Sequence, residues 1–297
     1  MYRRLLSSAL LAVTVVLAAQ ASDKNLRRCS GSDNPDVQIA ACTALIQSSR
    51  ETNEIVATAF YNRGNAYLLK EQYNQAIQDY DQALRLNPKE VGAFSNRGYA
   101  YVQKEQYDQA IQDYDRALRF DPQDTQAFAG RGNAYAQKGQ YDQAIQDYDQ
   151  ALRLNPKFST AFYLRGNAYT QKGQYDRALQ DYEQALRLNP NDEDAVYSRG
   201  FLFLDKLRDY DRAIRDYDQV LRLNPRRTQA FVGRGLAYEG KRQYDRAIQD
   251  YDQALHINPN DAVALFWRGE AKKLKGDTAG GDADLARASQ LNLQGKR

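Results

Sequence analysis

The chain repeats itself about every 34 residues, and no other feature limits its possible folds as strongly. Asn-Pro or Asp-Pro pairs recur at intervals of 34, 34, 34, 35 and 34 residues, with their prolines at Pro88, Pro122, Pro156, Pro190, Pro225 and Pro259. A fixed period of this size predicts a stack of small units, each of which contacts only its neighbours. Seven copies follow one another at residues 57–90, 91–124, 125–158, 159–192, 193–227, 228–261 and 262–295. We therefore expect one elongated repeat domain, although length alone would suggest two domains.

The third copy shows how one unit is built. Its apolar residues recur at helical spacing over residues 125–138 and again over 141–154, which predicts two amphipathic helices. Gly139 separates the two helices. Asn155-Pro156 ends the second helix, because proline disfavours the helical conformation in the residue before it.

Small and bulky residues hold fixed positions in this unit. They are Phe128 at position 4, Gly132 at 8, Tyr135 at 11, Ala144 at 20, Tyr148 at 24, Ala151 at 27 and Pro156 at 32. The pattern resembles the tetratricopeptide repeat, in a bacterial exported type with Asn-Arg-Gly repeats. The resemblance implies an all-α fold, namely a right-handed superhelical solenoid of antiparallel helix pairs. It also implies binding of other proteins, with small residues where the helices approach and tyrosines between the layers.

Residues 1–21 differ in kind from the repeats. Arg3 and Arg4 precede an apolar run from Leu5 to Leu17, and Ala19-Gln20-Ala21 is a small-x-small cleavage sequence. These features predict a secretory signal peptide that is removed after Ala21. The alternative is an uncleaved anchor, although the apolar run is short for a membrane span. We expect a protein that is either periplasmic or secreted, and of the two we favour the periplasm of a Gram-negative cell. After cleavage of the signal peptide we expect no membrane insertion.

Both cysteines, Cys29 and Cys42, fall in residues 22–56, before the first full copy. Val37 to Ile46 has the pattern of a second repeat helix, with Cys42 where later copies have tyrosine. In an exported protein two cysteines favour a disulfide, which for a loop of about 14 residues contributes roughly 3 kcal/mol. We therefore predict a disulfide-bonded half-repeat that covers this end of the solenoid. Two buried free thiols remain the alternative.

An arginine and an aspartate recur in every copy. The arginine stands at position 7, where the family usually has leucine, as Arg63, Arg97, Arg131, Arg165, Arg199, Arg234 and Arg268. The aspartate stands at position 23, as Asp79, Asp113, Asp147, Asp181, Asp216, Asp250 and Asp284. Guanidinium and carboxylate groups fit each other in bidentate geometry. Our hypothesis is a largely buried, structural Arg–Asp pair between the two helices of each unit.

The overall charge indicates neither nucleic acid nor an acidic surface as a partner. Without Arg3 and Arg4 the chain has 39 basic and 38 acidic residues, and no basic face of the kind that binds phosphate backbones is visible. Acid-before-base pairs four residues apart predict ion pairs along the second helices. These pairs are Asp81–Arg85, Asp115–Arg119, Asp149–Arg153 and Glu183–Arg187.

The sequence offers no catalytic constellation. The single histidine, His256, takes a place that other copies give to arginine near the end of a second helix, so we expect a surface residue. No His, Cys and carboxylate cluster has metal-ligand spacing, and the glycines do not form a phosphate-binding loop. We therefore predict no enzyme activity, no metal and no cofactor.

In relatives, positions 2, 5, 9, 12 and 13 of the first helix line a groove that holds an extended or helical peptide, and positions 5 and 9 supply most of the predicted contacts. In this chain the resemblance places there Tyr61, Asn65, Tyr99, Asn133, Tyr163, Asn167, Tyr197 and Phe201. Asparagine can donate to and accept from a peptide backbone, and aromatic rings offer contact area at low entropic cost. The first four copies are neutral in this region, whereas the last three add apolar and acidic residues. Those are Asp194, Phe201, Asp205, Leu236, Glu239 and Glu270.

Two copies depart from the pattern. The fifth has one extra residue, which we place in the turn from Asp205 to Asp209. The seventh has Lys272 in place of the aromatic residue and no closing proline, as expected of a terminal repeat that caps the stack. The sequence thus predicts a scaffold or adaptor that binds peptide segments in its groove. The alternatives are a structural protein that associates with itself through the seventh copy, and groove residues that bind nothing.

Overall fold

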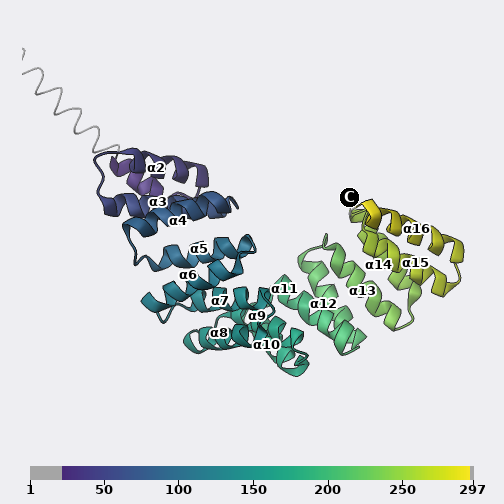
Figure 1. The fold of residues 1–297 in the computed structure, drawn as a ribbon. Helices are drawn as coiled ribbons and strands as arrows, with labels where there is room; N and C mark the ends of the chain where they lie inside the picture. Colours follow the sequence, from purple (N-terminus) through teal and green to yellow (C-terminus); the bar gives the residue numbers. More distant parts are fainter. Residues whose placement is uncertain (1–21, 295–297) are drawn as a thin grey trace, which may run out of the picture. The chain divides into compact units, whose positions relative to one another are not determined.

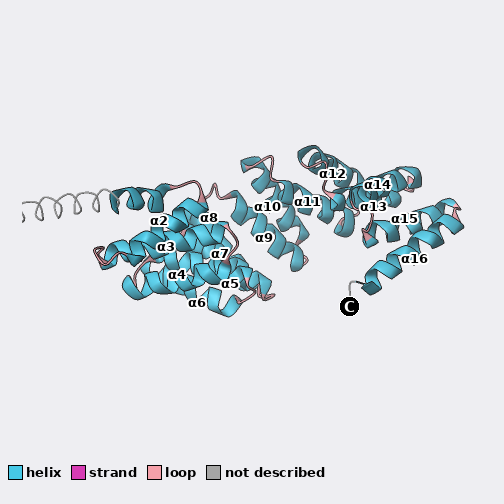
Figure 2. Cartoon of the chain, turned by 90° about the horizontal axis from the view of Figure 1, so that it is seen from above, coloured by secondary structure: helices cyan, strands magenta, loops and turns pink. Residues whose placement is uncertain are grey.

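A computed structural model describes residues 22–294 of the chain, which are helical with short connections and include no strand (Figure 1, Figure 2). They form two compact units that divide between Asn155 and Pro156. The predicted signal peptide at residues 1–21 lies outside the described residues. Among the helices that are described, none has both the length and the apolar character that crossing a membrane requires.

The first unit begins with a helical segment at residues 22–31. Its further helices are α2 (Pro35–Gln47), α3 (Asn53–Leu69), α4 (Tyr73–Leu86), α5 (Val91–Gln103), α6 (Tyr107–Phe120), α7 (Thr125–Gln137) and α8 (Tyr141–Leu154). The main helix contacts are between α3 and α4, α5 and α6, and α7 and α8, and each pair also packs against the next. These three pairs are the first three repeats.

The second unit continues the same arrangement. Its helices are α9 (Ser159–Gln171), α10 (Tyr175–Leu188), α11 (Glu193–Phe201), α12 (Tyr210–Leu223), α13 (Thr228–Gly240), α14 (Tyr244–Ile257), α15 (Ala262–Lys275) and α16 (Thr278–Gln294). A π-helical turn, Leu202–Lys206, joins the end of α11. The predicted fold class, an all-α array of antiparallel helix pairs, is confirmed.

Close packing within a pair depends on small residues opposite a buried tyrosine. Tyr148 of α8 has no exposed surface, and neither has Ala144 one turn before it. A Cβ atom on Gly132 of α7 would lie 2.8 Å from the ring of Tyr148, closer than carbon atoms can pack. Glycine at position 8 therefore lets the two helices approach, as the sequence predicts.

The turn between the helices of a pair uses a left-handed backbone. Gly139 adopts φ +74°, and Glu105 adopts φ +59° at the same place in the second repeat. This conformation suits glycine but costs other L-residues roughly 1 kcal/mol or more. The second repeat thus holds a locally strained residue where the third has a relaxed one.

The sequence places the extra residue of the fifth repeat in the turn after the first helix, and the structure corrects this prediction. The extra residue is accommodated inside the first helix, where Leu207 N–H donates to the carbonyl of Leu202, 3.1 Å away. This i→i+5 bond defines the π-helical turn. The bulge keeps Leu202 and Phe203 buried, because it returns the helix to register with the core after one added residue.

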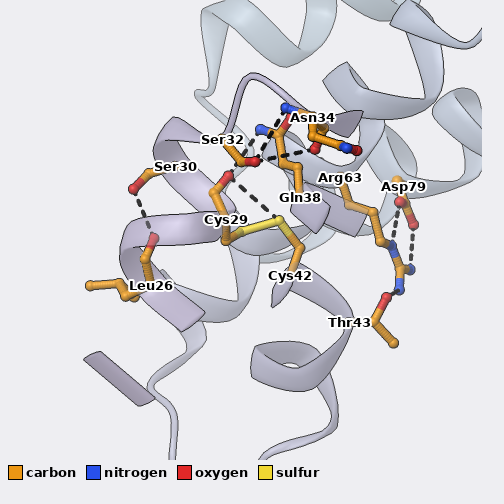
Figure 3. The surroundings of a disulfide bond; sticks show 10 residues. All are labelled: Leu26, Cys29, Ser30, Ser32, Asn34, Gln38, Cys42, Thr43, Arg63 and Asp79. Carbon is orange, nitrogen blue, oxygen red and sulfur yellow. Dashed lines mark hydrogen bonds and ion pairs between the residues drawn. A yellow bond between two sulfur atoms is a disulfide. The ribbon is translucent and has the colours of Figure 1, made fainter. Parts of the chain in front are cut away.

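A disulfide joins Cys29 to Cys42, and both residues are buried (Figure 3). Their Cα atoms lie 4.8 Å apart, within the range that a disulfide spans. Gln38 Nε2 donates to the Cys29 carbonyl at 2.9 Å, so the helical segment at 22–31 and α2 are also linked by a hydrogen bond. Together they form the short pair that precedes the first full repeat.

Candidate functional site

The Arg–Asp pair predicted for each repeat is present in all seven repeats. In the second repeat, Arg97 Nε and Nη2 each donate to a carboxylate oxygen of Asp113 at 2.6 Å. The other six pairs have the same two bonds, with lengths between 2.5 and 2.9 Å across the set. The aspartates are buried. In the third repeat the hydrogen bond to Asp147 raises the pKa of Arg131 above its ordinary value, so the guanidinium stays charged, whereas burial raises the pKa of Asp147.

Within the first unit, the third nitrogen of the guanidinium links a repeat to the one before it. Arg97 Nη1 donates to Asp81, and Arg131 Nη1 donates to Asp115 at 2.5 Å. The spacing of Asp81 and Arg85 predicts a pair within one helix, and this prediction is wrong, because Asp81 binds Arg97 instead. A carboxylate at position 25 can reach the first helix of the following repeat, where the arginine is already held in place by its own aspartate.

The half-repeat uses the same link with a different partner. Arg63 Nη1 donates to the hydroxyl oxygen of Thr43 at 2.9 Å, while its other nitrogens bind Asp79 (Figure 3). Thr43 follows Cys42 as Asp81 follows Tyr80. The half-repeat is thus joined to the first repeat as one repeat is joined to the next.

The link is absent at one junction of the second unit. Arg234 and Arg268 donate to Asp218 and Asp252 of their preceding repeats at 2.5 and 2.7 Å. Arg199 makes no such bond to Glu183 among the described residues, and α10 packs against α11 less extensively than α12 packs against α13. The junction between the fourth and fifth repeats is therefore the weaker one.

Two predicted groove asparagines bind tyrosines of their own repeats. The Tyr80 hydroxyl donates to Asn65 Oδ1 at 2.7 Å, and the Tyr182 hydroxyl donates to Asn167 Oδ1 at the same distance. Asn133 makes no side-chain hydrogen bond to any described residue. These bonds give Asn65 and Asn167 a structural role in addition to the predicted one, and they leave Asn133 available.

The predicted aromatic residues divide into packed and exposed side chains. Tyr61, Tyr163 and Tyr197 each pack against the buried tyrosine of their own repeat, with ring centroids 6.1, 6.4 and 5.7 Å apart. Tyr99 and Phe201 instead keep 48% and 44% of their surface exposed. The first three are therefore part of the wall of the helix array, and the last two present open apolar surface.

Phe201 also leaves a neighbour without a partner. It takes the place that Asn65 and Asn167 have in their repeats, and a phenyl ring cannot accept the tyrosine hydroxyl bond as an amide does. In the described part of the chain, the Tyr217 hydroxyl is the buried side-chain polar atom without a hydrogen-bond partner. The sequence already indicates this unpartnered hydroxyl, because the fifth repeat has Phe201 where other repeats have asparagine.

A cavity of about 560 Å³ lies beside Tyr61 in the first unit. It is lined by Glu54, Ala57, Thr58, Tyr61, Asn62, Leu86, Asn87 and Glu90. The lining joins the start of α3 to the end of α4, so it borders the face that carries Tyr61 and Asn65. Its size leaves room for more than one side chain of a bound peptide.

Position 13 of the first helix adds exposed residues that the predicted site did not include. Leu69 ends α3 with 72% of its surface exposed, and Leu274 in α15 has 59% exposed. At positions 2 and 5 of the same helix, Val263 and Phe266 have 56% and 43% of their surface exposed. The sequence did contain a signal for these residues, because each is an apolar residue at a position that lines the groove in relatives.

Two carboxylates lie beside this surface of α15. Glu239 of α13 accepts a hydrogen bond from the Tyr251 hydroxyl at 3.1 Å, and Glu270 is on α15. Burial raises the pKa of Glu239 to about 7 against the effect of the Tyr251 bond, and the negative charge of Glu270 adds to the rise.

The described residues contain no group of three or more His, Cys, Asp or Glu side chains that could hold a metal ion. His256 is exposed near the end of α14, at the surface as the sequence predicts. The aspartates at position 23 are all engaged in the Arg–Asp pairs described above.

Models of the tetratricopeptide repeat match the chain over residues 130–193 and 204–271, and others match 57–90, 79–112 and 98–139. Together these matches cover more than half of the chain. No curated protein matches it at a significant level.

Solved structures with the same fold include the MamA protein, at 27% identity and a TM-score of 0.51 over 58% of this chain and 93% of that one. YrrB, described as a TPR protein with an unusual peptide-binding site, has 27% identity and a TM-score of 0.52 over 65% of this chain and 97% of YrrB. A tetratricopeptide repeat protein from Parabacteroides merdae reaches a TM-score of 0.61 at 21% identity, over 79% of this chain and 93% of that one. With seven full helix pairs in residues 53–294 and these sequence matches, the chain belongs to the tetratricopeptide repeat family.

Proposed function

We propose that this protein is an exported adaptor that binds peptide segments of other proteins on the face formed by its first helices. Tetratricopeptide repeats generally mediate protein–protein interaction and are typical of non-enzymatic modules. The observation that carries the proposal is the open apolar surface at groove positions, with Leu69 72% and Tyr99 48% exposed. A contiguous exposed apolar patch marks an interaction surface, and Leu69 and Tyr99 are on α3 and α5, two first helices that contact each other.

Two further features support a peptide as the ligand. The cavity beside Tyr61 has room for more than one side chain, and the side chain of Asn133 on α7 makes no hydrogen bond to a described residue, so it can bond to a peptide backbone. YrrB, at 27% identity, is described as having a peptide-binding site. An extended or helical segment that lies across the first helices would contact the exposed apolar surface, the cavity and the Asn133 amide.

Export is supported by the sequence of residues 1–21 and by the cysteines. Disulfides persist in oxidising compartments such as the periplasm and are rare in the cytosol. Cys29 and Cys42 are buried and joined, which suits a periplasmic or secreted protein. Detection of the processed chain in a periplasmic fraction, with Ser22 at its amino terminus, tests this part of the proposal.

Peptide binding is best tested with a displayed library of random peptides, selected on immobilised protein without residues 1–21. We expect enriched peptides whose binding is lost in a Leu69→Ser/Tyr99→Ser variant. Leu154→Ser is the matched control, because Leu154 is an exposed apolar residue at the end of a second helix. Alanine at Asn65 would be a poor probe, since it removes the partner of the buried Tyr80 hydroxyl. Failure of any peptide to enrich would contradict the proposal.

Self-association through the seventh repeat is the alternative, and the exposed face of α15 is the observation that favours it. It predicts a mass that rises with concentration. Light scattering after size exclusion measures that mass directly, and a constant monomer mass would remove this alternative.

A further inference from the structure

We propose that the face formed by α13 and α15 binds a cationic amphipathic peptide segment, whose apolar side chains contact α15 and whose lysines or arginines meet Glu239 and Glu270. This inference rests on the proposed peptide-binding function and names the chemistry of the ligand for one part of the surface. We call this surface the acidic–apolar face. It consists of Leu236, Glu239, Val263, Phe266, Glu270 and Leu274.

The apolar half of the face is a single stripe on α15. Val263, Phe266, Glu270 and Leu274 follow one another at intervals of three, four and four residues, which places them on one side of the helix. The three apolar members are all exposed, by 43 to 59%. The opposite side of α15 supplies Ala264, Leu265 and Ala271 to the core. The exposed stripe is therefore not needed to pack the repeat.

The acidic half lies within and beside that stripe. Glu270 is between Phe266 and Leu274 on α15, and α13, which carries Glu239, packs against α15. Neither carboxylate has an ion pair with a cationic side chain among the described residues. A bound segment that covers this surface would bury both charges, at a large cost unless it brings charges of opposite sign.

The lysines of α15 do not supply that charge. Lys272 binds Asp284 at 2.8 Å and Lys273 binds Asp282 at 3.0 Å. Lys275 is paired with Asp245 on α14. All three ammonium groups are engaged with aspartates of α14 and α16, so the net charge presented by the acidic–apolar face is negative.

The corresponding surface of the first repeat has no acidic residue at positions 9 and 12, so the negative charge is specific to the acidic–apolar face. Positions 9 and 12, which hold Glu270 and Glu239 in the seventh and sixth repeats, hold Asn65 and Leu68 in the first repeat. Leu69 there is exposed at the same position as Leu274. The two surfaces share apolar character and differ in charge, and electrostatic complementarity then sets which ligand each one prefers.

The test uses the protein without residues 1–21 and two synthetic helix-forming peptides of about 18 residues. Both have leucines along one face. One has lysines beside the leucines and the other has glutamates, and neither contains tryptophan. Trp267, the only tryptophan of the chain, has its ring centroid 5.1 Å from that of Phe266. Its fluorescence therefore reports binding at this face, and the anisotropy of labelled peptide gives the affinity.

We expect the lysine peptide to bind at least about tenfold more tightly than the glutamate peptide, with an affinity that falls as salt increases. Glu270→Gln should weaken the lysine peptide about fivefold, as loss of one partly exposed charge pair does. Glu183→Gln removes the same charge from the exposed surface of α10 and should change nothing. Leu274→Ser should weaken binding, whereas Leu154→Ser, at an exposed apolar residue near the end of a second helix, should not.

Equal affinity for the two peptides, or equal effects of the Glu270 and Glu183 variants, would overturn the inference. A dimer that Leu274→Ser abolishes would overturn it in favour of a second copy of this chain as the occupant. Library peptides that bind the wild type through Leu69 and Tyr99, together with no binding of the lysine peptide, would refute this inference while leaving the proposed function intact. A library without binders, together with no binding of either peptide, would refute both.

Discussion

Removal of Asp113 should destabilise the protein by about 3 kcal/mol. Asp113 is 3% and Arg97 9% exposed, and Asp113→Ala leaves the guanidinium without its two hydrogen bonds of 2.6 Å. Breaking a buried pair by removing one partner costs about 3–5 kcal/mol. We expect the lower end, because Arg97 keeps Asp81 and lies 5.7 Å from the centroid of the Phe94 ring.

Urea unfolding followed by circular dichroism measures this loss. Repeat arrays can unfold in steps, so hydrogen exchange in α5 and α6 should locate the loss there. Asp81→Ala is the matched control, since the Asp81 side chain is 47% exposed and its pair should contribute less than about 1 kcal/mol. In Arg97→Met/Asp113→Leu no buried charge is left unpaired, so this double variant should lie within about 1 kcal/mol of the wild type.

Equal losses for Asp113→Ala and Asp81→Ala would refute the reasoning, because they would mean that burial does not distinguish the two carboxylates. So would a double variant as unstable as Asp113→Ala. That outcome would show that packing around the side chains, rather than the unpaired guanidinium, determines the loss.

Three further predictions follow from local features. Glu105→Gly should stabilise the protein by about 0.5–1 kcal/mol, because its left-handed φ of +59° suits glycine, whereas Gly139→Ala should destabilise it by about 1 kcal/mol; urea midpoints measure both. Replacing Cys29 and Cys42 by serine should cost the half-repeat about 3 kcal/mol, seen as faster hydrogen exchange in α2 with no change in α14. Burial raises the folded-state pKa of Glu239 to about 7 from an ordinary value of 4.5, so its contribution to stability is present below about pH 4.5 and is lost as the pH rises through 7. Because this carboxyl is partly exposed, Glu239→Gln should gain about 1–2 kcal/mol on the wild type between about pH 5 and pH 8, and a constant difference across that range would contradict the assignment.

The sequence predicts the repeat fold and the Arg–Asp pairs because both depend on what every copy shares. Position 7 is arginine in each copy and position 23 is aspartate, and helix pairing brings the two together in only one way. The link from Arg97 to Asp81 was not predictable in the same manner. Asp81 lies one helical turn from Arg85 as well, and only the packing of neighbouring repeats decides between the two partners.

The candidate site was predictable by position but not by bonding. Asn65 lies on the predicted face, yet its amide oxygen accepts from Tyr80, a contact between helices that no local spacing reveals. The extra residue of the fifth repeat was visible, but whether a turn or a helix takes it up depends on the packing of Leu202 and Phe203. The peptide-binding role of the predicted residues stays a prediction.

The missing link between Arg199 and Glu183 has a mechanical consequence. A linear stack under tension yields first where the fewest bonds cross between neighbours, and at this junction α10 and α11 also pack sparsely. The adjoining π-helical turn and the unbonded Tyr217 hydroxyl lower the resistance of the same place. Pulled from its two ends in an optical trap, the second unit should open there first, so that the fifth to seventh repeats separate together, carrying the acidic–apolar face with them as an intact piece.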